Sequence, residues 1–124
     1  MAAQPKVTLN VNFAGKTFRV VRNDGPDAEV TAETVFTFQQ EQRSGLTIVH
    51  ADYSGGGVVF GKLVGVWEDD KIRHSYVQLN RRGEFHRGNG TDEIKVTPEG
   101  KIQLIDTWKW ETKEGSGLCI LEEM

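Results

Sequence analysis

Four side chains in this sequence are candidates for proton transfer: His74, Asp106, Glu84 and His86. Imidazole and carboxyl groups are common general acids and bases in enzymes, because their surroundings can tune their pKa values toward neutrality. Ser54 could complete a triad with His74 and Asp106, but the sequence lacks the nucleophile elbow that would present such a serine. The four residues are therefore catalytic candidates without a predicted reaction.

Metal binding and disulfide bonding are not expected. The three histidines, His50, His74 and His86, would be enough for a metal site, but no two of them have the close spacing typical of metal ligands. The single cysteine, Cys119, cannot form an internal disulfide or a cysteine-based zinc site. We therefore predict no metal and no cofactor, and a reducing compartment suits the cysteine content best.

Two predicted strands carry polar residues on faces that are otherwise apolar. His74, Tyr76 and Gln78 share one face with Ile72, and Asp106 interrupts an apolar face of the other strand. Inside a barrel, such groups are costly unless they bond to one another or to a ligand. An outward orientation of these faces is the alternative. For the second strand the inward orientation is favoured, because the opposite row is polar apart from Ile105: Lys101, Gln103, Thr107, Lys109 and Glu111.

Aromatic residues are candidates for contacts with a ligand. Apolar rings exclude water from a binding site, while a few polar groups fix the orientation of the ligand. Aromatic side chains in a small barrel also commonly form plain core. The predicted ligand-binding residues are Tyr53, Trp67, Tyr76, Gln78, Trp108 and Trp110.

The elements that would position these residues are β-strands. Apolar and polar residues alternate with a period of two along most of the chain, and no helical period persists for three turns. Short turns marked by glycine or charged residues join the segments, a pattern typical of an antiparallel meander. The predicted strands cover residues 7–13, 16–22, 29–40, 46–53, 58–67, 71–80, 84–91, 101–111 and 116–123.

A meander of this length has two unpaired edge strands, and both are removed if the first and last strands pair and close the sheet into a barrel. We therefore predict an all-β fold, a single closed antiparallel up-and-down barrel of about eight or nine strands. Such a barrel has an interior that is either filled or holds one small ligand. Gly61 and Gly65 would let the strand 58–67 coil sharply or let a neighbour approach closely. The barrel domain is predicted to span 7–124, after a disordered tip at 1–6.

Composition argues against two classes of partner. The 124 residues carry a formal net charge of −3, with no basic block that could bind nucleic acid or an anionic membrane surface. No apolar run approaches the roughly 18 residues of a membrane-spanning helix. The N-terminal residues lack the apolar core of a signal peptide, so a cytoplasmic location is expected.

Three motif blocks occur in order along the chain. They read Tyr53-Ser54-Gly55-Gly56 with Gly61-x-Leu63-x-Gly65, then Tyr76-x-x-Leu79-Asn80-x-x-Gly83-Glu84, then Leu104…Trp108-x-Trp110. With these blocks, the chain from about Lys16 to Glu123 resembles a family of small bacterial proteins that often carry the label N-acetylglutamate synthase. The resemblance implies an avidin- or lipocalin-like antiparallel barrel and supplies no catalytic residues. Acetyl transfer of the usual kind uses a helix N-terminus to receive the pyrophosphate of the coenzyme; none is predicted here, so we expect no binding of acetyl-coenzyme A.

The sequence supports three hypotheses for function. The first is a barrel that binds a small, partly apolar molecule in a cavity lined by aromatic residues. The second is a cofactor-independent isomerase or cyclase that holds a flexible, partly apolar, polyketide-like substrate in the same cavity. The third is a structural barrel with a filled interior. If Trp108 and Trp110 faced outward instead, the exposed pair would favour a homodimer. Whether the protein is an enzyme is left open by the sequence.

Overall fold

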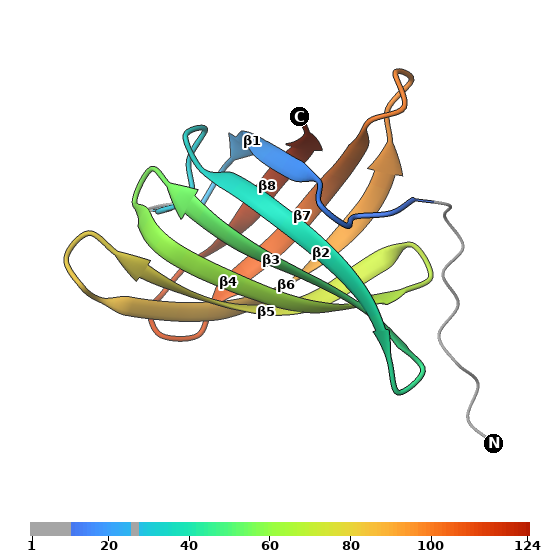
Figure 1. Ribbon diagram of the computed structural model, residues 1–124. Helices are drawn as coiled ribbons and strands as arrows, with labels where there is room; N and C mark the ends of the chain where they lie inside the picture. The colour runs from blue at the N-terminus through green and yellow to red at the C-terminus, as the bar shows by residue number, and fades with distance from the viewer. Residues whose placement is uncertain (1–10, 26–27) are drawn as a thin grey trace.

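The computed structural model describes residues 11–25 and 28–124, and strands are its only regular elements there. Eight strands follow one another in antiparallel, up-and-down order, and β1 pairs with β8 to close the barrel (Figure 1). The predicted all-β closed barrel is confirmed. The strands are β1 (Thr17–Asn23), β2 (Val35–Arg43), β3 (Leu46–Gly55), β4 (Val58–Glu68), β5 (Lys71–Asn80), β6 (Phe85–Val96), β7 (Ile102–Trp110) and β8 (Ser116–Glu123).

The second predicted long strand starts later than the alternation suggested. It was expected over 29–40, but β2 begins only at Val35. Thr31 and Thr34 form a turn instead: the Thr31 backbone N–H donates to Thr34 Oγ1 (3.0 Å), and the Thr34 N–H donates to the Thr31 carbonyl oxygen (2.9 Å). Threonine hydroxyls compete with strand pairing in this way. Because β2 starts only after this turn, the segment before the turn is not paired in the sheet and lies against the barrel interior.

The strand predicted over 84–91 is too short. β6 continues to Val96, and in the added part buried Asp92 and Ile94 alternate with exposed charged residues. An aspartate on the inward face weakened the apolar pattern by which a strand is recognised. This extension brings Asp92 into the barrel interior.

The first predicted strand does not join the barrel in the part of the chain that the structure describes. Residues 11–13 of the predicted strand 7–13 precede β1 outside the sheet, although Phe13 is fully buried. Residues 7–10, and the tip predicted at 1–6, lie outside the described residues. Phe13 is held by a hydrogen bond from its backbone N–H to Oε1 of Gln40 (3.0 Å).

The barrel interior has two halves. At one end, which we call the filled end, lie the β2–β3, β4–β5 and β6–β7 turns; at the other, the loop end, lie the remaining connections (Figure 1). Phe13, Phe18, Phe38 and Trp67 pack together near the filled end, with ring centroids 5.4 Å apart for Phe13 and Trp67 and 4.9 Å apart for Phe18 and Phe38. Burying each such side chain contributes about 1.5–3 kcal/mol. This half therefore supplies stability.

The strand β4 departs from strict alternation at its start. The sequence pattern placed Val59 on the same side as Gly61, but a bulge between Val58 and Phe60 turns both Val59 and Phe60 outward. From Gly61 onward strict alternation returns, and Gly61, Leu63, Gly65 and Trp67 are buried on one side. Gly61 permits a close approach, because a Cβ atom there would overlap the ring of Tyr53. The aromatic ring of a neighbouring strand thus occupies the space above this glycine.

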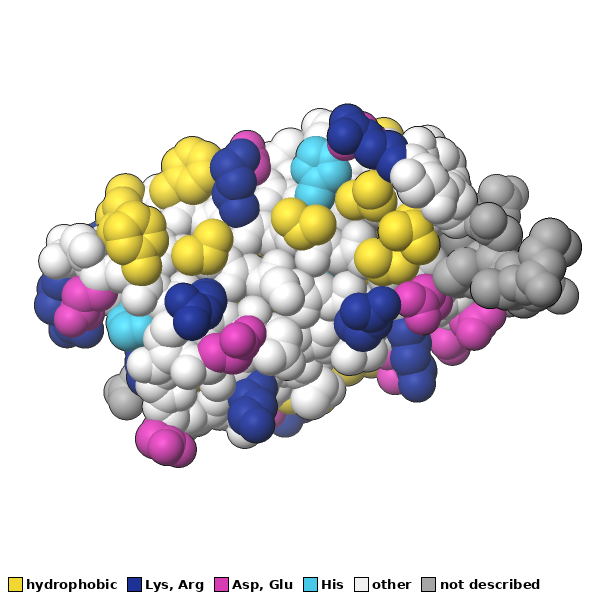
Figure 2. Space-filling view, turned by 90° about the horizontal axis from the view of Figure 1, so that it is seen from below, with side chains coloured by type: hydrophobic (Ala, Val, Ile, Leu, Met, Phe, Trp, Pro, Cys, Tyr) yellow, Lys and Arg dark blue, Asp and Glu magenta, His cyan; other side chains and the backbone are white. Residues whose placement is uncertain are grey.

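The outer surface of the barrel mixes apolar and charged side chains. Figure 2 shows hydrophobic groups separated by basic and acidic groups on the lower face. Phe60, Val64, Val77 and Phe85 are among the exposed apolar residues of β4, β5 and β6. Within the described residues, no helix has the length and apolar character needed to cross a membrane.

Candidate functional site

A cavity of about 40 Å³ lies inside the barrel toward the loop end. Five of the six predicted ligand-binding residues line it: Tyr53, Tyr76, Gln78, Trp108 and Trp110. Ala28, Glu29 and Val30, from the connection between β1 and β2, line it as well. The sixth predicted residue, Trp67, does not line the cavity. It packs against Phe13 near the filled end, and its indole N–H donates to the carbonyl oxygen of Asp69 (2.9 Å).

The aromatic wall of the cavity is built by cross-strand neighbours. Tyr76 on β5 and Trp110 on β7 both pair with Gly88 on β6, so the two rings meet over a residue without a side chain. Their centroids lie 5.6 Å apart, and those of Trp108 and Trp110 lie 5.5 Å apart, both in edge-to-face arrangement. The indole N–H of Trp108 donates to Oδ1 of Asn23 (3.2 Å). The prediction that Trp108 and Trp110 face inward is confirmed.

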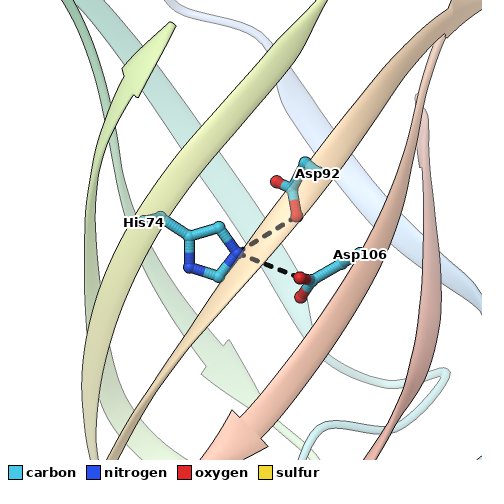
Figure 3. A group of neighbouring side chains, drawn as sticks. All are labelled: His74, Asp92 and Asp106. Carbon is cyan, nitrogen blue, oxygen red and sulfur yellow. Dashed lines mark hydrogen bonds and ion pairs between the residues drawn. The ribbon is translucent and has the colours of Figure 1, made fainter.

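His74, Asp92 and Asp106 form a buried polar cluster at this cavity (Figure 3). Nε2 of His74 lies 3.1 Å from Oδ1 of Asp92 and 3.0 Å from Oδ1 of Asp106. The strand register brings them together: Asp92 and Asp106 are direct cross-strand partners, and His74 pairs with Gly90. A Cβ atom at Gly90 would lie 2.7 Å from Oδ1 of Asp106 and 3.0 Å from Cε1 of His74. The cluster therefore requires glycine at that position.

The cluster holds protons tightly. Burial by itself would lower the pKa of His74, but the charge of Asp92 and the hydrogen bond to Asp106 raise it to about 10. Burial raises the pKa of Asp106 well above its ordinary value, and the negative charge of Asp92 adds to the effect. Near neutral pH the imidazole of His74 is therefore protonated, and Asp106 keeps its proton to higher pH than an exposed carboxyl group does.

The cluster is better suited to sharing protons than to holding a metal ion. The three residues could offer one ligand atom each, within 4.8 Å of one another. A histidine that binds a metal almost always donates its other ring N–H to a partner that orients the ring. Among the described residues, Nδ1 of His74 and Oδ2 of Asp92 have no hydrogen-bond partner. The supporting contacts expected of a metal site are thus missing on both side chains.

A chain of hydrogen bonds runs from the interior to the mouth of the barrel. The Tyr53 hydroxyl donates to Oε1 of Gln78 (2.8 Å), and Nε2 of Gln78 donates to Oε1 of Glu29 (3.0 Å). The second oxygen of Glu29 accepts from Nδ2 of Asn80 (2.8 Å). Burial raises the pKa of Tyr53, which therefore stays neutral and acts as a donor. Glu29 thus ties the segment before β2 to the cavity residues on β5.

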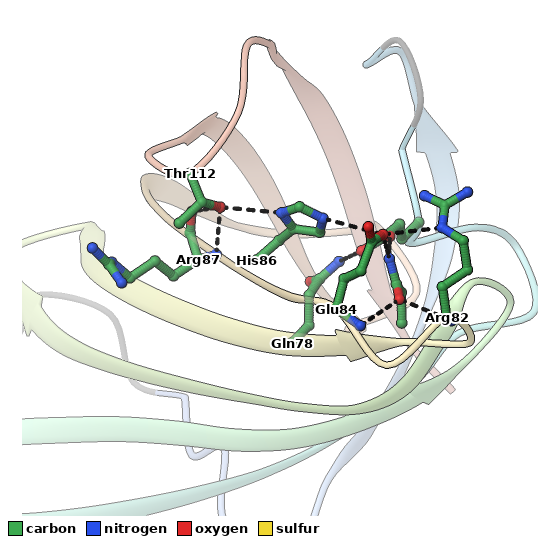
Figure 4. Close-up of polar contacts among 8 residues, drawn as sticks. Gln78, Arg82, Glu84, His86, Arg87 and Thr112 are labelled. Atoms are coloured by element: carbon green, nitrogen blue, oxygen red, sulfur yellow. Dashed lines mark hydrogen bonds and ion pairs between the residues drawn. The ribbon is translucent and has the colours of Figure 1, made fainter.

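The other two catalytic candidates, Glu84 and His86, lie at the loop-end rim and do not line the cavity (Figure 4). Glu84 is exposed, and hydrogen bonds from Asn80 and Arg82 lower the pKa of its carboxyl group. Nδ1 of His86 lies 3.2 Å from the Thr112 hydroxyl, and its Nε2 lies 3.8 Å from Glu84. The structure therefore brings His74 and Asp106 together and leaves Glu84 and His86 outside.

Sequence reasoning missed three polar residues of the cavity: Asp92, Glu29 and Asn23. Asp92 would have shared an inward face with Gly88 and Gly90 if the strand had been extended past Thr91. Glu29 and Asn23 lie at or beyond strand ends, where no alternation indicates direction. Cys119, noted only as the single cysteine, also lines the cavity, and burial raises the pKa of its thiol.

The fold and the site together define a class: a small closed antiparallel barrel with one end filled by aromatic core and a polar, aromatic-walled cavity toward the other. The comparison with family models gives the family. The chain belongs to the avidin-like protein family, whose model matches residues 11–124. The predicted avidin-like barrel is thereby confirmed. Searches of the curated proteins and of the solved structures give no match.

Proposed function

We propose that this protein binds a small, partly apolar molecule in the cavity near the loop end. The observation that carries the proposal is the meeting of five predicted contact residues with the buried cluster of His74, Asp92 and Asp106 around one cavity. Ligand sites typically combine such an apolar wall with a few polar groups that set orientation. Membership of the avidin-like protein family supports the same function class.

The contrast between the two halves of the barrel supports binding over a purely structural role. A barrel selected only for stability would fill both halves with apolar core, since buried polar groups cost free energy unless they are bonded. The cavity of about 40 Å³ has room for a few water molecules, since one water needs roughly 10–15 Å³ of such space. A ligand of several heavy atoms would therefore require the segment of Ala28, Glu29 and Val30, or the aromatic side chains, to move aside.

A titration with small molecules tests this proposal. Compounds of about five to ten heavy atoms, chosen to span cationic, neutral and anionic groups, would be added while tryptophan fluorescence is recorded. We expect at least one saturable change. Leu63→Phe, which fills the cavity, should abolish it, whereas Val64→Phe on the outer face of the same strand should not. Binding that survives Leu63→Phe unchanged would contradict the proposal.

The same cavity favours a second candidate, a cofactor-independent isomerase or cyclase acting on a flexible, partly apolar, polyketide-like substrate. The observation behind it is the Asp106 carboxyl group, which lines the cavity and has a raised pKa. A carboxylic acid kept neutral near pH 7 can donate a proton or a hydrogen bond to a bound substrate. Asp106→Asn would then remove turnover while leaving binding, and loss of binding alone would speak for a simple binding protein.

Three further expectations from the sequence stay predictions. A cytoplasmic location and the absence of acetyl-coenzyme A binding remain expected, the latter because the described residues that line the cavity include no lysine or arginine to meet its phosphates. A homodimer, if formed, would have to use another surface than the one predicted, because Trp110 faces inward. The exposed rings of Phe60 and Phe85 are the candidates for such a contact.

A further inference from the structure

We propose that the cavity selects a cationic ligand: a small primary ammonium group carried on an apolar carbon skeleton. The inference rests on the small-molecule binding proposed above and names the chemical class of the ligand. Asp106 would pair with the ammonium group, and Trp108, Trp110 and Tyr76 would surround the carbon atoms next to it.

The charges around the cavity favour a cation. Glu29, Asp92 and Asp106 are the acidic residues that line it, and the described lining residues include no lysine or arginine. Among the described lining residues, His74 is the only basic one, and its Nε2 is already held between two carboxylates. An anionic ligand would meet three acidic side chains and no free positive group among the described lining residues, which costs free energy in a poorly solvated site. A cationic ligand can instead pair with an acidic side chain and meets no free positive group among these residues that would repel it.

Asp106 is the member of the cluster that can reach a ligand. Its side chain is 14% exposed, compared with 0% for His74 and 1% for Asp92, and it lines the cavity. Oδ1 of Asp106 accepts from His74, and no N–H or hydroxyl group of the described residues bonds to Oδ2. An ammonium N–H could donate to this second oxygen in a charge-assisted hydrogen bond, which is roughly twice as strong as a neutral one.

The aromatic wall suits the same ligand. Alkylammonium groups are attracted to the faces of tryptophan and tyrosine rings, and the attraction is stronger where water is excluded. Trp110 already makes one contact of this kind, because Nζ of Lys113, which does not line the cavity, lies 4.7 Å from its ring centroid. The wall therefore offers cation binding and apolar contact together, a combination that a neutral ligand would use only in part.

We expect the bound cation to take the place of a proton, because this keeps the charge of the site balanced. Without ligand, burial beside Asp92 favours the protonated form of Asp106. A bound ammonium group would favour the ionised form, so the proton would be replaced by the positive charge of the ligand. The other titratable groups at the cavity are His74 and Tyr76 on β5, Tyr53 on β3, Cys119 on β8 and Glu29 before β2. The phenol and thiol groups are held neutral by burial, so Asp106 is the group that we expect to release the proton.

Three compounds with the same branched carbon skeleton test the inference: isobutylamine, isobutanol and isobutyrate. Binding to the full chain would be followed by tryptophan fluorescence and by calorimetry in two buffers of different ionisation enthalpy. We expect the amine to bind at least about tenfold more tightly than the alcohol, and the carboxylate to bind more weakly than either. Amine binding should release about one proton per ligand, and alcohol binding should release none.

Two variants locate the selectivity. Asp106→Asn should reduce the preference for the amine over the alcohol to less than about twofold while leaving the affinity for the alcohol unchanged. Asp52→Asn, an exposed carboxylate paired with Lys62 on the outer face, should keep the full preference. If Asp106→Asn does not fold, proton release by the wild-type protein still tests the inference. Binding of the amine without proton release would contradict the proposed exchange of a proton for the ammonium group.

The outcomes separate this inference from the function on which it rests. If the alcohol or the carboxylate binds as tightly as the amine, the cationic selectivity is wrong and small-molecule binding stands. If none of the three binds but another compound of the wider titration does, the cationic selectivity is again wrong, and the proposal of small-molecule binding stands. If no compound of either set binds, both proposals fail.

Discussion

His74 on β5 reaches Asp106 on β7 across the full width of β6, with Nε2 of the histidine 3.0 Å from Oδ1 of the aspartate. The intervening strand permits this contact because the residue between them is Gly90. Asp92, two positions further along β6, completes the cluster from the other side. A polar group of this kind, deep in a barrel and at the edge of a cavity, is the feature on which the chemistry of the site depends.

The protonation of this cluster should make stability depend on pH. The pKa of His74 rises from 6.5 in the unfolded chain to about 10 in the fold, so its stabilising contribution is complete below pH 6.5 and is lost as the pH rises toward 10. The raised pKa of Asp106 acts in the same direction from lower pH. We expect the free energy of unfolding to fall by on the order of 3 kcal/mol between pH 6 and pH 10.

Urea unfolding at several pH values measures this dependence. Asp106→Asn removes one titrating group and one partner of His74, so the slope with pH should become shallower. Thr107→Ala, an outward-facing neighbour on β7, should leave the slope as it is. A wild-type stability that is constant or rises between pH 7 and pH 10 would rule out the charge state described for the cluster.

Gly90→Ala should disturb the cluster directly. The added methyl group would meet Oδ1 of Asp106, Cε1 of His74 and the carbonyl oxygen of Thr107, the last at 2.8 Å. We expect a loss of about 1–3 kcal/mol in the free energy of unfolding, typical of an overfilled interior. The NMR signals of the His74 ring should move as well. Asn89→Ala, which changes the adjacent outward-facing residue, should shift neither by a comparable amount.

Elemental analysis and calorimetry check the expected absence of metal and acetyl-coenzyme A. We predict no stoichiometric metal in the purified protein, since Nδ1 of His74 and Oδ2 of Asp92 lack the partners that a metal site would supply. We also predict no binding of acetyl-coenzyme A in the micromolar range. One equivalent of zinc per chain would contradict the metal-free cluster, and a measurable heat of coenzyme binding would contradict a cavity without a phosphate site.

The barrel could be predicted from the sequence because period-two alternation is a local signal. In β7, Leu104, Trp108 and Trp110 alternate with residues that are polar except for Ile105, and this pattern alone gave the correct inward face. The same reasoning was wrong at Val59, because a bulge shifts the register by one residue and leaves no trace in the pattern. It also ended β6 early, since an inward aspartate is indistinguishable from an outward one in the sequence.

The site could be predicted only in part, because it depends on contacts between distant strands. Tyr76, Trp108 and Trp110 stood out by residue type on apolar faces. The pairing of His74 with Asp92 and Asp106 depends on the register of three strands, which no local pattern encodes. Trp67 was grouped with the cavity residues by residue type, yet its position near the β4–β5 turn places it at the filled end.

The most direct test of a binding cavity compares two tryptophans in the same barrel. Trp108→Leu and Trp67→Leu each remove a buried indole, and each should lower the free energy of unfolding by about 1–3 kcal/mol. Only Trp108 lines the cavity. For a compound that binds the wild-type protein, titration by calorimetry should therefore show affinity weakened at least about tenfold by Trp108→Leu and unchanged by Trp67→Leu. Equal affinities for the two variants would contradict a ligand site at the loop end.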